Sequence, residues 1–557
     1  MSLLFFILSF LSTASFSQDP VMDAMRDEIS RNISRLKDSS FPLPYFISYS
    51  VYDMENCSMD GNFGKISSNY LVKKRTAKID LRIGTSVFDS SNFATDLNRY
   101  LPFYMDIPAD DNYDAVRWGL WYLSDEAYKN ACEIFSMKKA YREKKAIADF
   151  YPEISQAPVV SYVSPESTAE LRCDVYRDIL ERVSNVSKKY PKVKSVDFTL
   201  NISKNIMRFA DSENRYFRKN SYQIVMRADI DFQDEKGYIK KDFKDFFYFS
   251  VEDFEKKAIA DAEGYIKMFS DSYPAQEIDY FAAPCIFEKD AAFELINSLF
   301  VRNISFFPPP ETEDENYLKY YYSLPRLVER IGKRVFPNFI DVYDDAGIKI
   351  YNGIQLVGAY DIDDEGVMPV KLRLVESGVL KTFYSSRRPS KYISYSNGRG
   401  RGNYDMYVYP FPSNVFIKSS KTYSDERFMK NVKKYAYEQG YDEVIFVEKI
   451  ASSIKDTSKP IQSPVVAYIM NLKSGEKRYV TNIDFEDPGT RILRDILFTS
   501  EKEYVVNFFE KGPFYNSSSV AASLVVPEKI FVREIGLVKS QDKPQKKTYI
   551  PHPYFGR

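Results

Sequence analysis

Histidine is the side chain best suited to metal binding and to proton transfer near neutral pH, and this chain of 557 residues has one, His552. It stands between two prolines close to the C-terminus. A catalytic zinc usually takes three protein ligands, mostly His, completed by Glu, Asp or Cys. One His in a proline-flanked tail cannot build such a site, and it cannot serve a Ser-His-Asp or Cys-His arrangement in a folded core. We therefore expect no histidine-based catalysis.

Acidic residues are concentrated at Asp361–Gly366, which begins like a calcium-binding loop. Such a loop needs a bidentate acid at its twelfth position, and that position is Leu372. We therefore reject an EF-hand and predict a β-turn with solvated acids.

A glycine-rich, basic stretch follows at Ser396–Gly402, with the sequence SNGRGRG. It lacks the Gly-Lys-Ser/Thr ending of a phosphate-binding loop. The pattern predicts a flexible basic loop, and two interpretations stay open, a structural turn and a binding loop.

The segment Ala283–Arg302 is the one around which the C-terminal half is organised. Cys285–Phe287 is a short apolar run that predicts a strand. Asp290 is a candidate N-cap, and apolar residues then recur at helical spacing up to Phe300. Periodicity alone predicts a short strand followed by a buried helix.

The pattern elsewhere predicts the α+β fold class. Thr76–Gly84 alternates apolar and charged residues, as in a half-buried antiparallel strand. Residues 111–149 form a long helical region, and the three prolines of Pro152–Pro165 indicate a joint within the N-terminal region. After Asp271 the chain becomes short strands broken by turn residues, with one more helix at Ser424–Gly440. We expect an N-terminal domain of helices and antiparallel sheet, then a β-rich C-terminal domain.

Four further patterns stand in a fixed order in residues 341–402: DVYDDAG, YDIDDEGV, VESGVLKTFYSSRRP and SNGRGRG. With the strand and helix before them, they resemble the TldD/PmbA family of zinc metallopeptidases, also called modulators of DNA gyrase. In the N-terminal half, YFISYSVYD and TAKIDLRIG resemble a secreted branch of the same family. The resemblance implies the family's two domains, at residues 18–275, with the joint near 152–165, and at residues 276–557.

The resemblance also implies that the zinc site has been lost. In active members the helix carries H-E-x-x-x-H, and the corresponding residues here are Asn297, Ser298 and Arg302. A cysteine ligand of the family corresponds to a position near Glu510. We therefore expect no metal, no cofactor and no catalytic residue, and we favour a protein that is not an enzyme. The loop SNGRGRG lies near the family's substrate cleft. Under the binding-loop interpretation, Asn397, Arg399 and Arg401 would face a peptide carboxylate or a partner.

Composition and the N-terminus bear on location. The formal net charge of −1 gives no attraction to nucleic acid. Residues 1–17 have the apolar run and small residues of a secretory signal, which would be cleaved or would stay as an anchor. No later stretch is apolar and long enough for a membrane helix. We expect a secreted or periplasmic protein. None of the cysteines is spaced as C-x-x-C, so disulfides and buried free thiols both remain open for Cys57, Cys132, Cys173 and Cys285.

These observations lead to one functional hypothesis and one alternative. Members of the resembled family work as pairs in which one subunit has the zinc site and the other lacks it. We expect this chain to be the second kind, a homo- or heterodimeric partner of a TldD-like zinc peptidase that helps to enclose peptide substrates. The alternative is a stand-alone peptide-binding or scaffold protein of the cell envelope.

Overall fold

The computed structural model describes residues 19–557 except 95–100, 148–150, 166–170, 192, 234–235, 317, 320–326, 453–458, 488, 513–518, 547–553 and 555–557. The predicted signal segment, residues 1–17, and His552 lie outside the described residues.

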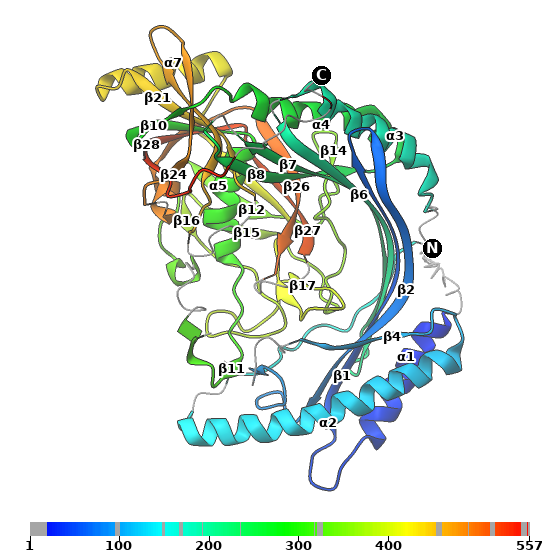
Figure 1. Cartoon of the computed structure of the whole chain (residues 1–557). Coiled ribbons are helices and arrows are strands. Elements are labelled where there is room, and N and C mark those ends of the chain that lie inside the picture. The colour runs from blue at the N-terminus through cyan, green and yellow to red at the C-terminus, as the bar shows by residue number, and fades with distance from the viewer. Residues whose placement is uncertain are drawn as a thin grey trace, which may run out of the picture.

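A long curved sheet forms one side of the molecule, and the C-terminal half forms the other (Figure 1). Its strand order is β4-β2-β1-β6-β7-β5, with β8 paired to β7. The strands are β1 (Pro44–Asn62), β2 (Lys65–Ile83), β4 (Phe103–Ile107), β5 (Ser161–Val163), β6 (Val193–Asp211), β7 (Tyr216–Gln233) and β8 (Ile239–Tyr248). The sheet is antiparallel except for the short strand β5, which pairs with β7 in parallel. Strand β2 begins well before the predicted strand Thr76–Gly84, because its pairing with β1 continues through a largely exposed N-terminal part.

Two helices cover one face of this sheet at its N-terminal end, α1 (Pro20–Arg35) and α2 (Tyr113–Lys145). Ile47, Tyr49 and Val51 of β1 point into the core that these helices close. Because side chains alternate along a strand, the residues between them point to the opposite face, toward the C-terminal half. Two more helices, α3 (Asp174–Ser184) and α4 (Val251–Asp271), cover the other end of the sheet (Figure 1).

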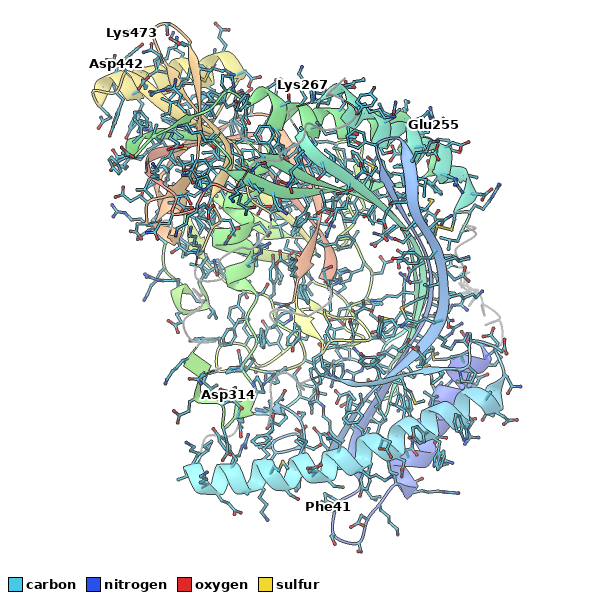
Figure 2. All side chains as sticks on the ribbon, viewed as in Figure 1. Phe41, Glu255, Lys267, Asp314, Asp442 and Lys473 are labelled. Carbon is cyan, nitrogen blue, oxygen red and sulfur yellow. A yellow bond between two sulfur atoms is a disulfide. The ribbon has the colours of Figure 1, made fainter. Side chains whose placement is uncertain are left out.

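The outer face of α4 is polar. Glu255 and Lys267 are exposed and point outward from it (Figure 2). Its buried face includes Phe254, Ile266 and Phe269. This is the amphipathic pattern of a helix that covers a sheet.

Two sheets build the C-terminal half. The nine-stranded sheet consists of β9 (Gln276–Glu277), β10 (Tyr280–Glu288), β20 (Thr422–Tyr423), β21 (Glu443–Ile450), β22 (Pro464–Asn471), β23 (Lys477–Thr481), β24 (Ile483–Phe485), β25 (Ile496–Ser500) and β28 (Lys529–Lys539). The six-stranded sheet consists of β12 (Ile340–Asp344), β15 (Leu372–Glu376), β16 (Val379–Leu380), β19 (Asn414–Ser419), β26 (Glu503–Lys511) and β27 (Ser519–Pro527). Helix α7 (Asp425–Glu438) packs on the nine-stranded sheet. The chain combines helices with sheets whose strands are mostly antiparallel, so the α+β expectation is confirmed.

Three short strand pairs lie outside these sheets: β3 (Phe93–Ala94) with β11 (Glu311–Thr312), β13 (Ile350–Tyr351) with β14 (Ile354–Gln355), and β17 (Gly400–Arg401) with β18 (Tyr409–Pro410). The first pair joins the N-terminal and C-terminal halves, since its strands are more than two hundred residues apart in sequence. Turns of 3-10 helix occur at Asn185–Lys189, Leu327–Arg330 and Thr490–Asp495. Across the described residues, no helix has the length and apolar character needed to span a membrane.

The predicted helix of the organising segment is present as α5 (Asp290–Ile296), and every one of its residues is buried. It continues as a π-helical turn, Asn297–Val301, and a 3-10 turn, Arg302–Ile304. Asp290 does not cap the helix, contrary to the prediction. Its carboxylate accepts hydrogen bonds from Lys244 Nζ, at 2.7 and 2.9 Å, and from Tyr504 OH at 2.8 Å. Asp290 therefore binds side chains of β8 and β26 instead of capping its own helix.

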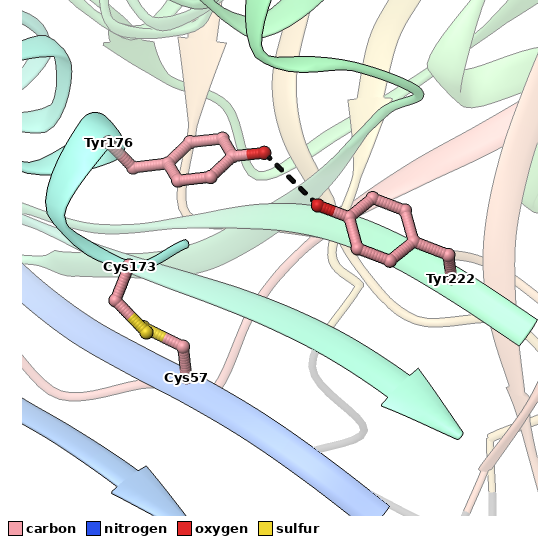
Figure 3. The surroundings of a disulfide bond; sticks show 4 residues. All are labelled: Cys57, Cys173, Tyr176 and Tyr222. Carbon is pink, nitrogen blue, oxygen red and sulfur yellow. Dashed lines mark hydrogen bonds between the residues drawn. A yellow bond between two sulfur atoms is a disulfide. The ribbon is translucent and has the colours of Figure 1, made fainter. Parts of the chain in front are cut away.

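One disulfide joins the start of α3 to the curved sheet, between Cys173 and Cys57 of β1 (Figure 3). Their Cα atoms are 6.0 Å apart. Nearby, Tyr176 OH and Tyr222 OH are 3.3 Å apart and share a hydrogen bond. Cys132 and Cys285 are buried free thiols. Both of the open possibilities for the cysteines therefore occur in this protein.

Candidate functional site

The residues at the zinc-motif positions lie in one place, where the turn after α5 meets β26. Asn297 Nδ2 donates to Glu510 Oε2 at 3.2 Å, and Arg302 Nε lies 3.0 Å from Glu510 Oε1. One carboxylate thus accepts from both side chains, although it is about two hundred residues away in sequence. Ser298 is buried beside Asn297, and its carbonyl accepts from Asn303 Nδ2 at 3.0 Å.

The charges of this cluster neutralise one another. Burial by itself would lower the pKa of Arg302, but the carboxylates of Glu510 and Glu294 raise it further than burial lowers it. Arg302 therefore stays protonated. Asn297 and Glu510 are almost completely buried, and the Oδ1 atom of Asn297 has no hydrogen-bond partner among the described residues. The ion pair of Arg302 with Glu510 and the amide of Asn297 therefore occupy this site.

A serine and a lysine approach each other beside this cluster. Lys449 Nζ donates to Ser452 Oγ at 2.6 Å, and Ser452 Oγ donates to Glu294 Oε1 at 3.3 Å. A lysine acting as a general base must be neutral. Burial would lower the pKa of Lys449, but the carboxylates of Asp242, Glu294 and Asp290 outweigh burial and raise it. Lys449 keeps its proton, so this pair is not an activated nucleophile.

The sequence analysis missed this serine and lysine pair. Asp242, which lies 3.3 Å from Lys449 Nζ, comes from β8 of the curved sheet. The sequence held one indication, Asp242, a charged residue at an inward-facing strand position. A buried charge predicts a partner of opposite charge, but it does not say which residue that partner is.

Between these side chains lies a cavity of about 80 Å³. It is too small for a peptide. Its lining includes Lys244, Asp290, Glu294, Asn297, Arg302, Lys449 and Ser452.

The donor set does not fit zinc. Zinc in proteins takes Cys, His, Asp and Glu. The positions in question hold an amide, a hydroxyl and a guanidinium, and the one carboxylate is already paired with Arg302. In the part of the chain that the structure describes, no group of three or more His, Cys, Asp and Glu residues is placed to hold a metal. We therefore derive no metal-dependent step for this protein.

Two residues of the predicted binding loop serve the fold instead. Arg399 is completely buried, and its Nη2 donates to Asp344 Oδ1 at 2.8 Å and to Val370 O at 2.9 Å. Asn397 Nδ2 donates to Phe383 O at 2.8 Å. The expectation that Arg399 and Asn397 face a ligand is corrected, because buried backbone and carboxylate acceptors already use these donors.

Arg401 is half-buried. Its Nη1 donates to Ala521 O at 2.6 Å, and its guanidinium lies 4.7 Å from the centre of the Tyr360 ring. A contact of Arg401 with a ligand remains a prediction.

Two acids of the acidic turn, Asp363 and Asp364, are buried, contrary to the expectation of solvated acids, whereas Asp361 is exposed as expected. Asp363 is completely buried and accepts hydrogen bonds from the backbone N–H groups of Glu365, Val367 and Gly400 at 2.8 to 3.0 Å. It shapes the turn and ties it to the SNGRGRG loop.

Comparison with known proteins agrees with this geometry. Residues 282–531 match the model of the PmbA/TldA metallopeptidase C-terminal domain. A curated metalloprotease of Methanocaldococcus jannaschii is 31% identical over 176 residues, which are 30% of this chain and 34% of that protein. The matched part thus spans about a third of the length of that relative.

Solved structures share the fold over nearly the whole chain. TldE from Thermococcus kodakarensis superposes with a TM-score of 0.60 at 15% identity, covering 92% of this chain and all of that one. A candidate modulator of a DNA gyrase from Thermotoga maritima gives 0.57 at 13% identity, covering 92% of this chain and 99% of that one. A similar protein from Bacteroides thetaiotaomicron gives 0.55 at 11% identity, covering 93% and 98%.

The fold and the match of the C-terminal part define the class of metallopeptidase-like α+β proteins. Within that class, the C-terminal part of the chain, residues 282–531, belongs to the TldD/PmbA family. The expectation taken from the sequence motifs is confirmed.

Proposed function

We propose that this chain is an exported, non-catalytic member of the TldD/PmbA family that pairs with a zinc-bearing member and helps to enclose its peptide substrates. The observation that carries the proposal is the closed cluster at the end of α5. Asn297, Arg302 and Glu510, which the resemblance puts at positions of the zinc motif, bind one another. The fold of the family is kept over most of the chain, which supports a role that needs the scaffold.

The disulfide supports the exported part of the proposal. Disulfides persist in oxidising compartments and are rare in reducing ones. Mass spectrometry of the chain recovered from its native cells should find Cys57 bonded to Cys173, and an N-terminus close to Gln18. A reduced Cys57 together with an intact Met1 would contradict export.

The pairing is tested by producing the mature chain together with a family member from the same organism that carries an intact H-E-x-x-x-H motif. Light scattering after gel filtration should show a stable complex of the two chains. An unstructured peptide should be cleaved faster by the complex than by the zinc-bearing chain alone. The matched control is a complex in which the partner's motif glutamate is changed to glutamine, which should form and should not cleave.

Failure of the two chains to associate would overturn the pairing. The stand-alone binder of the cell envelope would then be the better account. A complex that forms but leaves the cleavage rate unchanged would overturn the role in enclosing substrates.

A further inference from the structure

A second, larger cavity lies between the curved sheet and the C-terminal half. Its volume is about 520 Å³, within the usual range for small-molecule sites. It is bounded by strands β1 and β2, by α2, and by C-terminal residues including Glu365, Arg387 and Tyr407. Neither α5 nor β26 contributes to it. The cavity is therefore separate from the cluster around Glu510.

One wall of the cavity is the face of the curved sheet opposite to α1 and α2, and the lining also includes residues of both faces of β2 and of α2 itself. Phe46, Ser48 and Ser50 follow one another on this face of β1, and Phe209 of β6 lies opposite Ser50. All four residues are buried. Serine side chains are small, so Ser48 and Ser50 leave space beside Phe46 and Phe209 on this wall.

One cation at this wall lacks an acidic partner. Lys78 lies opposite Ser50 in the register of β1 and β2, and it is 7% exposed. Its Nζ donates to two backbone carbonyls, Asn403 O at 2.8 Å and Met406 O at 3.2 Å. No carboxylate forms an ion pair with it among the described residues. Burial lowers the pKa of Lys78 to about 8, although nearby acids, first Asp364, act in the opposite direction.

The carboxylates that line the cavity already bind other groups of the protein. Asp80 holds Arg82 through both of its oxygens, at 2.8 to 3.1 Å. Asp364 holds Lys219 and accepts from Gly402 N at 2.7 Å, and Glu365 accepts from Arg387 N at 2.6 Å.

A second lining cation, Arg388, donates from Nη2 to Pro309 O at 3.0 Å, and no ion pair with it occurs in the described part of the chain. Among the described residues, two cations of one cavity lining thus lack a carboxylate partner.

The other part of the cavity is apolar. Ala127, Ala131 and Ile134 of α2 line it together with Phe93 and Phe103. The side chains of Ala127 and Ala131 are small, so they leave space beside α2. The cavity therefore has a cationic part and an apolar part, which is the pattern of a site for an amphipathic anion.

We propose that this cavity is a binding site for a small organic acid, a carboxylate on an apolar body, with Lys78 and Arg388 as partners of the carboxylate. The proposal does not depend on the pairing with a zinc peptidase. It adds a ligand class that the family resemblance did not supply.

The test uses decanoate as the anion, with decanol as its neutral analogue, and isothermal titration calorimetry on the full mature chain. We expect decanoate to bind once per chain and decanol to bind at least tenfold more weakly. Equal binding of the two compounds would overturn the charged part of the site. Absence of decanoate binding would overturn the proposal.

The position of the site is tested with two variants. Lys78→Met should weaken decanoate binding at least tenfold, whereas Lys73→Met, an exposed position on the same strand, should leave it unchanged. Ser50→Leu keeps both cations and fills the space at this wall, so it should also abolish binding while its circular dichroism stays that of the parent. If Lys78→Met does not fold, Ser50→Leu alone decides. Full binding by a folded Ser50→Leu variant would place the ligand elsewhere and overturn the assignment.

Discussion

Two charged regions of this protein, both buried, are built in opposite ways. At the end of α5 each charged side chain meets a charge of the other sign, as Arg302 meets Glu510 and Lys244 meets Asp290. At the face of the curved sheet, Lys78 meets only carbonyl oxygens beside an open volume of about 520 Å³. The volume beside Glu510 is about 80 Å³.

The difference distinguishes a cluster whose charges are paired with one another from a cavity with an unpaired positive charge on its wall. An ion pair inside a protein is costly to desolvate and gives little net stability, but removing one partner is expensive. The residues of the α5 cluster satisfy one another, which agrees with our proposal that they stand in place of zinc ligands. Around Lys78, a positive charge without a carboxylate partner among the described residues lies beside an open cavity, as expected of the anion site that we propose.

The largest effect is expected from breaking the α5 cluster on one side. Arg302→Met should lower the free energy of unfolding by about 3 kcal/mol, because Glu510 stays buried without its cation. Glu510→Met should cost less, since the side chain of Arg302 is 33% exposed and can reach water. The double variant should recover at least half of the loss. The measurement is urea unfolding of the four proteins. Additive losses in the double variant would show that the two residues do not act as a pair.

An effect of similar size, reached only at alkaline pH, is expected at Lys78. The pKa of Lys78 is about 8 in the folded protein and about 10.4 in an unfolded chain. Between these values the unfolded state binds more protons, so stability should rise with pH. Relative to Lys78→Met, the parent should gain up to about 3 kcal/mol across this interval and nothing below pH 7. The comparison with Lys78→Met removes the contributions of other groups near the ammonium, which are Tyr52, Asp80, Asp364, Glu365 and Asp405. A flat difference from pH 7 to 10.5 would contradict the shifted pKa.

Next in size is the contribution of Asp290. Burial would raise its pKa, but Lys244 and Lys449 lower it by more. A carboxylate with a lowered pKa stabilises the fold above the ordinary carboxyl pKa, and it loses this contribution as the pH falls through the lowered value. Asp290→Asn should therefore cost about 2 kcal/mol at pH 7, and the difference from the parent should shrink at acid pH. Thermal unfolding between pH 7 and 3 measures it. A difference that grows at acid pH would mean that the ion pair with Lys244 is not what stabilises Asp290.

The smallest effect is expected from Lys78→Met at pH 7. The substitution leaves no acid without its cation, so the free energy of unfolding should change by less than about 1 kcal/mol. Urea unfolding beside Arg302→Met gives the direct comparison. A loss as large as that of Arg302→Met would show that Lys78 is a structural tether for the loop at Asn403.

Local patterns predicted the elements better than they predicted the partners. Helical spacing predicted the buried helix at Asp290, and strand alternation predicted the curved sheet at Thr76. The family motifs placed Asn297 and Glu510 in one site, which no periodicity could do. The sequence did not predict that Asp290 would bind Lys244 or that Arg399 would be buried against Asp344, because both depend on which strands lie side by side. The cavity around Lys78 was missed for the same reason, since its walls come from three parts of the chain.

The central claim is that the α5 cluster has replaced the family's zinc site. The most direct test is the zinc content of the purified mature chain after expression with added zinc, measured by inductively coupled plasma mass spectrometry. The matched control restores the family ligands with Asn297→His, Ser298→Glu, Arg302→His and Glu510→Cys together, and it should bind about one zinc per chain. For the natural chain we expect far less than one equivalent. One full equivalent of zinc in the natural chain would contradict the account.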